Sequence, residues 1–146
     1  DTRQEEFGAA PLGAGQAETW SFTSFVDDVS IDGRPVGPQS ALLGNLTATG
    51  LEPRPDWPTW APEIDSFLTV FPAAEGDQLP TASNVNLAQG QSVANAALLR
   101  YGSSMVDGEA DTASVRVFNH DGQIHYIVDA SAVVLADDPE TSPDCG

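Results

Sequence analysis

Apolar residues recur at every second position in several short segments, and this pattern constrains the fold of the chain more than any other feature. Residues 18–29, 41–49, 66–71, 114–119 and 123–135 follow it. A period of two is that of a β-strand with one buried face, and glycine or proline interrupts the chain about every ten residues. The sequence therefore predicts an all-β fold. We expect an antiparallel β-sandwich, immunoglobulin-like or jelly-roll-like, of about seven or eight strands.

Three further segments are less sharply defined. His120-Asp121-Gly122 separates two β-rich segments, and Asp-Gly in this position predicts a hairpin between residues 114–119 and 123–135. Residues 83–88 form a weaker strand candidate. Residues 92–100 fit either a strand or a short helix, because alanine and leucine favour helices.

Two segments are predicted to be long loops. Residues 51–65 contain four prolines and two tryptophans, and residues 102–113 are small and acidic. The remaining strands are close enough in sequence to form one domain over residues 1–136. Residues 137–146 are predicted to be an acidic tail, because their composition disfavours a packed core.

The charge balance excludes several classes of partner. The chain carries 22 acidic residues and five arginines, with no lysine, and its formal net charge is −17. It cannot neutralise a run of phosphates, so we expect no nucleic-acid partner. Docking on an anionic membrane is equally unfavourable, and no apolar run reaches the roughly 20 residues of a membrane helix. The same charge opposes self-association unless salt or divalent cations screen it.

Seven short motifs resemble, in the same order, those of a β-rich repeat from secreted and cell-surface proteins of actinobacteria and related bacteria. The matching segments span nearly the whole chain: Asp1-Thr2-Arg3, Leu12-Gly13-Ala14-Gly15, Asn45-Leu46-Thr47-Ala48-Thr49, Phe67-Leu68-Thr69-Val70-Phe71-Pro72, Ala82-Ser83-Asn84-Val85-Asn86, Gly90-Gln91-Ser92-Val93-Ala94-Asn95 and Tyr126-Ile127-Val128-Asp129. The resemblance implies an extracellular, non-catalytic β-domain, usually an accessory of larger proteins.

The chain departs from that family in ways that bear on assembly. Many members carry a cysteine pair, and the matching positions, near Ala73 and Val117, hold no cysteine. The closing Gly-Tyr-Phe of the family is replaced by Ala132-Val133-Val134. Family members also have an apolar strand before Asp-Thr-Arg, whereas this sequence begins at Asp1. A missing leading strand would leave an open sheet edge, and open edges pair with other chains.

Acidic residues at alternate positions, Asp107, Glu109 and Asp111, are the candidate metal ligands. Oxygen-rich sets of this kind suit Ca²⁺, the one cofactor that the sequence suggests. An EF-hand would also need a glutamate at its twelfth position, which is Phe118 here. The competing interpretation is a solvated acidic loop without a bound ion, and it is the one that we favour.

Two tryptophans, Trp57 and Trp60, lie in the proline-rich segment and are the main candidates for ligand binding. Their rings could form a stacking platform for sugars. They could equally anchor a protein interface, where tryptophan is enriched, or fold back to cap one end of the sandwich. Trp20 lies in an alternating segment and is predicted to be part of the core.

The sequence offers little for catalysis or covalent chemistry. His120 and His125 flank a predicted turn, and no Gly-x-Ser-x-Gly motif is present. Two histidines and the single cysteine, Cys145, are too few for a zinc site of the usual kind. Cys145 is a candidate for cross-linking two chains, or a free thiol. We therefore expect no enzymatic activity.

Together these features predict a non-catalytic, extracellular structural protein of the cell surface that self-associates. Strand addition between copies would build a homo-oligomer or polymer, such as a filament or a layer. The alternative is an accessory module that binds cell-wall or other polysaccharide through Trp57 and Trp60.

Overall fold

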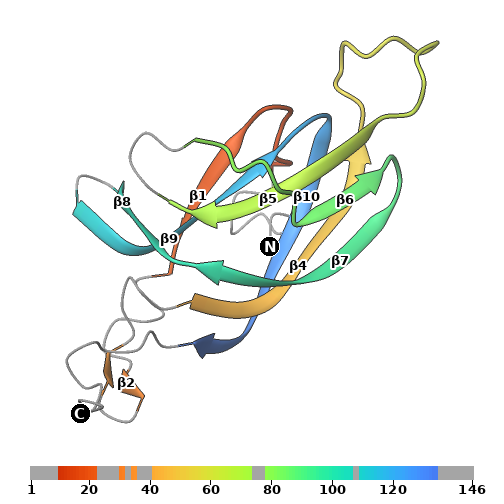
Figure 1. Cartoon of the computed structure of the whole chain (residues 1–146). Helices are drawn as coiled ribbons and strands as arrows, with labels where there is room; N and C mark the ends of the chain where they lie inside the picture. The colour runs from red at the N-terminus through yellow and green to blue at the C-terminus, as the bar shows by residue number, and fades with distance from the viewer. Residues whose placement is uncertain are drawn as a thin grey trace.

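A computed structural model shows the predicted all-β architecture, with two antiparallel sheets packed face to face as an open sandwich (Figure 1). The structure describes residues 10–22, 30–31, 34–35, 41–73, 78–106 and 109–134. Side chains are described for these residues except 30–31, 34–35, 103–106 and 109–112. No helix with the length and hydrophobicity to cross a membrane occurs in these ranges. The predicted tail, residues 137–146, lies outside them, as does the Asp1-Thr2-Arg3 motif.

The larger sheet has five strands and the smaller sheet has three. In the larger sheet the order is β1-β9-β5-β6, and β8 also pairs with β9. Its strands are β1 (Ala17–Ser21), β5 (Asp65–Pro72), β6 (Val85–Ala88), β8 (Gly102–Val106) and β9 (Glu109–Asn119). The smaller sheet, in the order β10-β4-β7, contains β4 (Ala41–Glu52), β7 (Ser92–Arg100) and β10 (Gln123–Val134). Two short strands, β2 (Ser30–Ile31) and β3 (Arg34–Pro35), pair separately.

The core lies between the two sheets and follows the alternation in the sequence. On β4, Leu42, Leu46 and Ala48 point inward and are buried, whereas Leu43 is exposed. On β10, Ile124 and Tyr126 are buried in the same way. Fully burying one leucine or isoleucine side chain contributes roughly 1.5–3 kcal/mol, so this interleaving is the main stabilising term.

The predicted hairpin between residues 114–119 and 123–135 is wrong. These segments become β9 and β10, which belong to different sheets. Both edges of β9 are occupied, by β1 on one side and by β5 and β8 on the other. Strand β10 instead pairs with β4 over ten register positions. An Asp-Gly turn signal reports a chain reversal, and here the reversal crosses from one sheet to the other.

This crossing distinguishes the sandwich from a constant-type immunoglobulin domain. In a constant-type immunoglobulin domain the first strand pairs with the second strand, and the last strand pairs with the penultimate strand. Here the partners are exchanged, because β1 pairs with β9 and β10 pairs with β4.

Other sequence predictions need smaller corrections. Residues 92–100 form strand β7 and not a helix, because β4 offers an edge with nine paired positions. Residues 102–113 are not a loop but contain β8 and the start of β9, which pair with each other. Strand β1 ends at Ser21, and residues 23–29 of the expected segment 18–29 lie outside the description.

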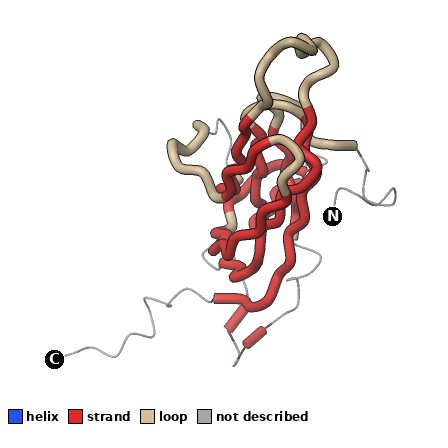
Figure 2. Tube along the Cα trace, turned by 90° about the vertical axis from the view of Figure 1, so that its right-hand side faces the viewer, coloured by secondary structure: helices blue, strands red, loops and turns tan. Residues whose placement is uncertain are grey.

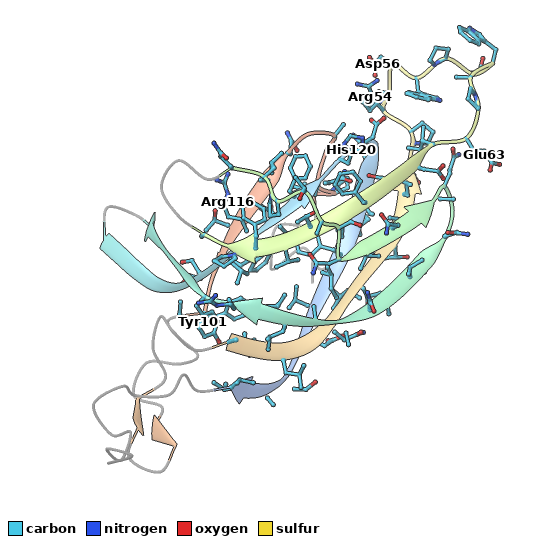
Figure 3. All side chains as sticks on the ribbon, viewed as in Figure 1. Arg54, Asp56, Glu63, Tyr101, Arg116 and His120 are labelled. Atoms are coloured by element: carbon cyan, nitrogen blue, oxygen red, sulfur yellow. The ribbon has the colours of Figure 1, made fainter. Side chains whose placement is uncertain are left out.

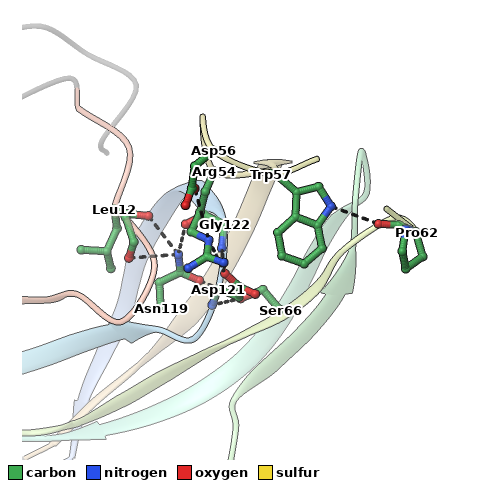
Figure 4. Close-up of polar contacts among 10 residues, drawn as sticks. Leu12, Arg54, Asp56, Trp57, Pro62, Ser66, Asn119, Asp121 and Gly122 are labelled. Atoms are coloured by element: carbon green, nitrogen blue, oxygen red, sulfur yellow. Dashed lines mark hydrogen bonds and ion pairs between the residues drawn. The ribbon is translucent and has the colours of Figure 1, made fainter. Parts of the chain in front are cut away.

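The end of the sandwich that carries the 120–122 turn is held by one buried side chain. The Asn119 amide donates hydrogen bonds to the backbone oxygens of Leu12, at 2.9 Å, and of Gly122, at 3.1 Å. Its Oδ1 accepts a hydrogen bond from the Ser66 hydroxyl at 2.8 Å. Asn119 thus joins three separate chain segments (Figure 4), and the loops of this end gather together in the side view (Figure 2).

Candidate functional site

The first candidate surface is the proline loop, residues 53–64, which projects from the sandwich between β4 and β5 (Figure 1). Arg54 braces it: its Nε lies 3.5 Å from Asp121 Oδ1 and 3.8 Å from Asp56 Oδ1. Its guanidinium carbon lies 5.6 Å from the centroid of the Trp57 ring, a cation–π distance. The Arg54–Asp121 ion pair therefore ties the loop to the 120–122 turn (Figure 4), and Figure 3 shows Arg54 and Asp56 together on the loop.

The structure separates the roles of the two tryptophans in this loop. Trp57 is half-buried and packs against the core, and its indole N–H donates a hydrogen bond to the Pro62 carbonyl at 3.2 Å. Trp60 is 85% exposed. Local packing, one of the three interpretations above, therefore holds for Trp57. Trp60 presents its apolar ring to solvent from a braced loop and remains a candidate for ligand binding.

The second candidate surface is an open groove of about 600 Å³ on the outer side of β5 and β6. The His120 ring stacks on Phe67, with centroids 4.5 Å apart and planes 11° apart. Asp65, Asn86 and Gln91 also line the groove and are exposed. A stacked ring pair bordered by a carboxylate and two amides suits a neutral polar ligand with a flat apolar face, such as a sugar.

The third candidate surface is the outer face of the three-stranded sheet, which we call the open face. Because directly paired residues of antiparallel strands share a face, the register defines its members. They are Ala41, Leu43, Asn45, Thr47, Thr49 and Glu52 of β4, Ser92, Ala94, Ala96, Leu98 and Arg100 of β7, and Gln123, His125, Ile127, Asp129, Ala132 and Val134 of β10.

Apolar side chains are concentrated at one end of the open face. Leu43 pairs directly with Leu98 on one side and with Ala132 on the other. Leu98 is 57% exposed, and Leu43 and Val134 are each nearly half exposed. Three of the five large hydrophobic residues that are exposed in the described part of the chain therefore lie together here. Contiguous exposed apolar surface is typical of interaction sites.

The open face is also close to electrically neutral. Its formally charged side chains are Arg100, Asp129 and Glu52, which give a net charge of −1, and all three residues are exposed. Glu52 lies at the far end of β4 from Leu43. Among the described residues none of the three has an ion-pair partner. In a chain with 22 acidic residues and five arginines, a face of this size with a net charge of −1 is weakly charged.

One polar network links the two sheets through the core. The Trp20 indole N–H donates a hydrogen bond to the Tyr126 hydroxyl, which donates to Glu18 Oε2 at 2.6 Å. Burial, and then the hydrogen bond to Glu18, raise the pKa of Tyr126 well above its usual range. Trp20 packs against the core, as predicted, although it is only partly buried.

The histidines and serines are engaged in ways that the sequence does not reveal. His120 stacks on Phe67, and His125 lies on the open face, on the side of β10 opposite the buried Tyr126. The Ser66 hydroxyl lies beside the groove but is buried and donates to Asn119. It also accepts a hydrogen bond from the Asp121 backbone N–H at 2.9 Å. Its bonding is thus structural in this arrangement.

The predicted metal ligands fall at the edge of the described structure. Asp107 lies outside it, and Glu109 and Asp111 have only their backbone described, as part of β9. Their segment is a strand pair and not the acidic loop that we expected. Within the part that is described, no three histidine, cysteine, aspartate or glutamate side chains are grouped closely enough to hold a metal ion. Cys145 lies outside the described residues.

Sequence reasoning missed the open face. Its signal was present, because Leu43 and Leu98 fall on the outward positions of alternating segments. The two leucines can be recognised as one surface only once residues 92–100 are assigned as a strand and paired with β4.

Comparisons with known proteins do not assign the chain to a family. The chain matches no protein-family model, no curated protein and no solved structure.

Proposed function

We propose that this protein is a non-catalytic structural protein of the cell surface that self-associates, and that the open face and the strand edges beside it form the contact. The concentration of exposed apolar side chains on a nearly neutral face supports this function best. Burying apolar area is the main driving force for association, and the apolar cluster around Leu43 and Leu98 contains no acidic side chain. Its extracellular location rests on the resemblance to secreted β-rich repeats.

The strand edges of the smaller sheet support strand addition between copies. Leu12 forms a bridge with Ile124 of β10. Beyond Tyr126, no described strand pairs with the outer edge of β10, and none forms a ladder with the outer edge of β7. Such edges carry backbone groups that can pair with a strand of another chain. Repetition of that contact would give a filament or a layer.

The net charge sets the conditions of the test. At −17 the chains repel one another, and this repulsion is screened within about 10 Å at 0.1 M salt. We expect light scattering after size-exclusion chromatography to show oligomers whose share grows with concentration, with salt and with millimolar Ca²⁺. Negative-stain images should then show ordered assemblies. A monomer under all these conditions would refute the proposal.

A pair of variants assigns the contact to the open face. Leu98→Glu places a charge at the centre of the apolar cluster and should abolish oligomers. Leu79→Glu is the matched control, because Leu79 is also exposed, at 51%, but is not part of the open face. Equal effects of the two changes would mean that added charge, and not the open face, controls association.

Polysaccharide binding is a second candidate function, favoured by the exposure of Trp60 on a braced loop. The exposed apolar face of an aromatic ring can stack on a sugar ring, and the loop that carries Trp60 is held to the sandwich through Arg54. Trp60→Ala removes this ring without disturbing the packed Trp57. Loss of binding to insoluble cell-wall polysaccharide, with oligomers intact, would support this function. Unchanged binding would exclude Trp60 as its site.

A further inference from the structure

We infer that two copies of the chain pair through their open faces about a two-fold axis that passes over Leu43, with Arg100 of each copy opposite Asp129 of the other. This inference rests on the proposed self-association and specifies its contact. It follows from three properties of the open face: its charges, its register and its apolar cluster.

The charges identify a second copy as the partner. A partner rich in basic residues would be drawn to the acidic remainder of the surface and not to this weakly charged face. A second copy brings one arginine and one aspartate, and a two-fold contact matches each with its opposite. Arg100 and Asp129 have no ion-pair partner among the described residues, and the two-fold contact would give each of them one.

The register fixes where the axis must lie. Asp129 pairs with Asn45 on β4, and Arg100 pairs with Ala41 on the same strand. Leu43 lies midway between Asn45 and Ala41, and β4 is the central strand between β10 and β7. Leu43 is therefore the midpoint of the diagonal from Asp129 to Arg100. A two-fold axis that lies between the facing sheets, over Leu43 and perpendicular to this diagonal, exchanges the two charged positions.

The same construction gives the packing angle. Neighbouring strands are about 4.8 Å apart and each residue advances about 3.4 Å along a strand. From these spacings, the strands of the two copies cross at about 70°, which is closer to orthogonal than to aligned packing. Orthogonal packing is one of the two common ways in which β-sheets stack.

The apolar cluster falls at the centre of this contact. Leu98 and Ala132 are the direct neighbours of Leu43 on β7 and β10. Both lie next to the axis, so each copy packs this row against the same row of the other. Ala94 and Ala96 carry only methyl groups and allow the two sheets to approach. The outcome is a dry centre with a pair of ion pairs at its rim. This contact does not use the outer edges of β7 and β10, so it is compatible with strand addition there.

Charge reversal tests the pairing. Arg100→Asp places two aspartates opposite each other at both contacts, and Asp129→Arg places two arginines there. Each single variant should weaken dimerisation at least about tenfold, because like charges oppose binding at an interface. An equimolar mixture of the two variants should restore it, because every contact then joins one arginine with one aspartate. Sedimentation velocity over a concentration series measures all three samples.

Net charge provides a sharp control. Asp129→Arg lowers the negative charge of the chain by two units and would strengthen any unspecific association. Asp56→Arg makes the same change at an exposed side chain of the proline loop, away from the open face. We expect Asp56→Arg to leave dimerisation unchanged or slightly stronger, and Asp129→Arg to weaken it. Thermal unfolding of each variant confirms that the fold is retained.

The outcomes separate the two proposals. If the unaltered chain self-associates but the single variants associate equally well, or the mixture fails to regain dimers, the two-fold pairing is overturned and the proposed function stands. If the unaltered chain remains monomeric at every salt and calcium concentration, both are overturned.

Discussion

The two sheets of the sandwich are covered differently. Strand β5, in the larger sheet, is buried on both faces over its second half: Leu68 and Val70 point to the core, and Thr69 and Phe71 on the other side are also buried. Strand β4, at the centre of the smaller sheet, is buried on its inner face, whereas Leu43 on its outer face is 44% exposed. A large apolar side chain on an uncovered face of the smaller sheet is what draws attention to the open face.

Buried polar groups follow the same division. The four polar residues that are buried in the described structure, Ser66, Thr69, Ser114 and Asn119, all belong to the larger sheet. A buried polar group needs a hydrogen-bond partner, and Thr69, for example, donates to the Ala82 carbonyl at 3.1 Å. The larger sheet is thus specified by polar bonds as well as packing. The smaller sheet depends on apolar contact at its inner face.

The largest expected effect separates the two faces of β4. Leu46→Ala removes a fully buried side chain and should lower the free energy of unfolding by about 2–5 kcal/mol. Leu43→Ala, three residues earlier, should change it by less than about 1 kcal/mol but weaken self-association. Chemical denaturation of both variants at a dilution that keeps the chain monomeric measures the difference. Similar losses for both would mean that the outer face is also part of the core.

The next effect tests the polar bonding of the larger sheet. Asn119→Ala leaves the Ser66 hydroxyl and three backbone carbonyls short of a partner and should cost about 2–4 kcal/mol. Asn45→Ala is the control in the smaller sheet, where Asn45 donates only to Thr47 at 3.2 Å, and about 0.5 kcal/mol is expected. Chemical denaturation measures both losses of stability from the shift of the unfolding midpoint, provided that the m-value is unchanged. Equal costs would show that the two sheets do not differ in their dependence on polar bonds.

The crossing between the sheets depends on Gly122, whose φ is 66°. A Cβ there would lie 2.5 Å from Ile64 Cδ1 and 2.6 Å from the Glu52 carbonyl oxygen, so Gly122→Ala should cost about 2–3 kcal/mol. Gly90 also has a positive φ but has open space around it, and Gly90→Ala should cost about 1 kcal/mol. Thermal melts of the two variants measure the contribution of the close contact. A smaller loss for Gly122 than for Gly90 would contradict it.

The smallest effect concerns the polar link between the sheets. Because its pKa is raised, Tyr126 keeps its proton in the folded chain at a pH where the unfolded chain loses it. Its contribution to stability is therefore complete below about pH 10 and declines above that pH. Tyr126→Phe should cost about 1 kcal/mol at neutral pH and reduce the loss of stability under alkaline conditions.

Tyr101→Phe is the matched control for this link. The Tyr101 hydroxyl is buried and has no hydrogen-bond partner among the residues that the structure describes. Its removal should therefore leave stability at neutral pH unchanged or slightly higher. Stability curves between pH 7 and pH 11 compare the two variants. A larger cost for Tyr101→Phe than for Tyr126→Phe would contradict the assigned network.

Local pattern was enough to place most strands and to identify the fold class. The alternation at Leu42, Leu46 and Ala48 reports a buried face whichever strand lies beside it, because side chains of a strand point alternately to its two sides. The proline loop was also predictable, since proline lacks the backbone N–H that a sheet interior requires. These properties belong to single segments of the chain.

Pairing partners and the fate of individual side chains were decided by the tertiary structure. Strand β10 pairs with β4 because both edges of β9 are occupied, a fact that no property of the Asp-Gly turn contains. The two tryptophans have similar sequence surroundings, yet Arg54 and Pro62 hold Trp57 while Trp60 is exposed. Likewise, Leu43 and Leu98 form one surface only because β4 and β7, some fifty residues apart in sequence, lie side by side. The sequence determined which side chains of each strand point to the same face. The pairing of strand edges determined which of these side chains lie next to one another.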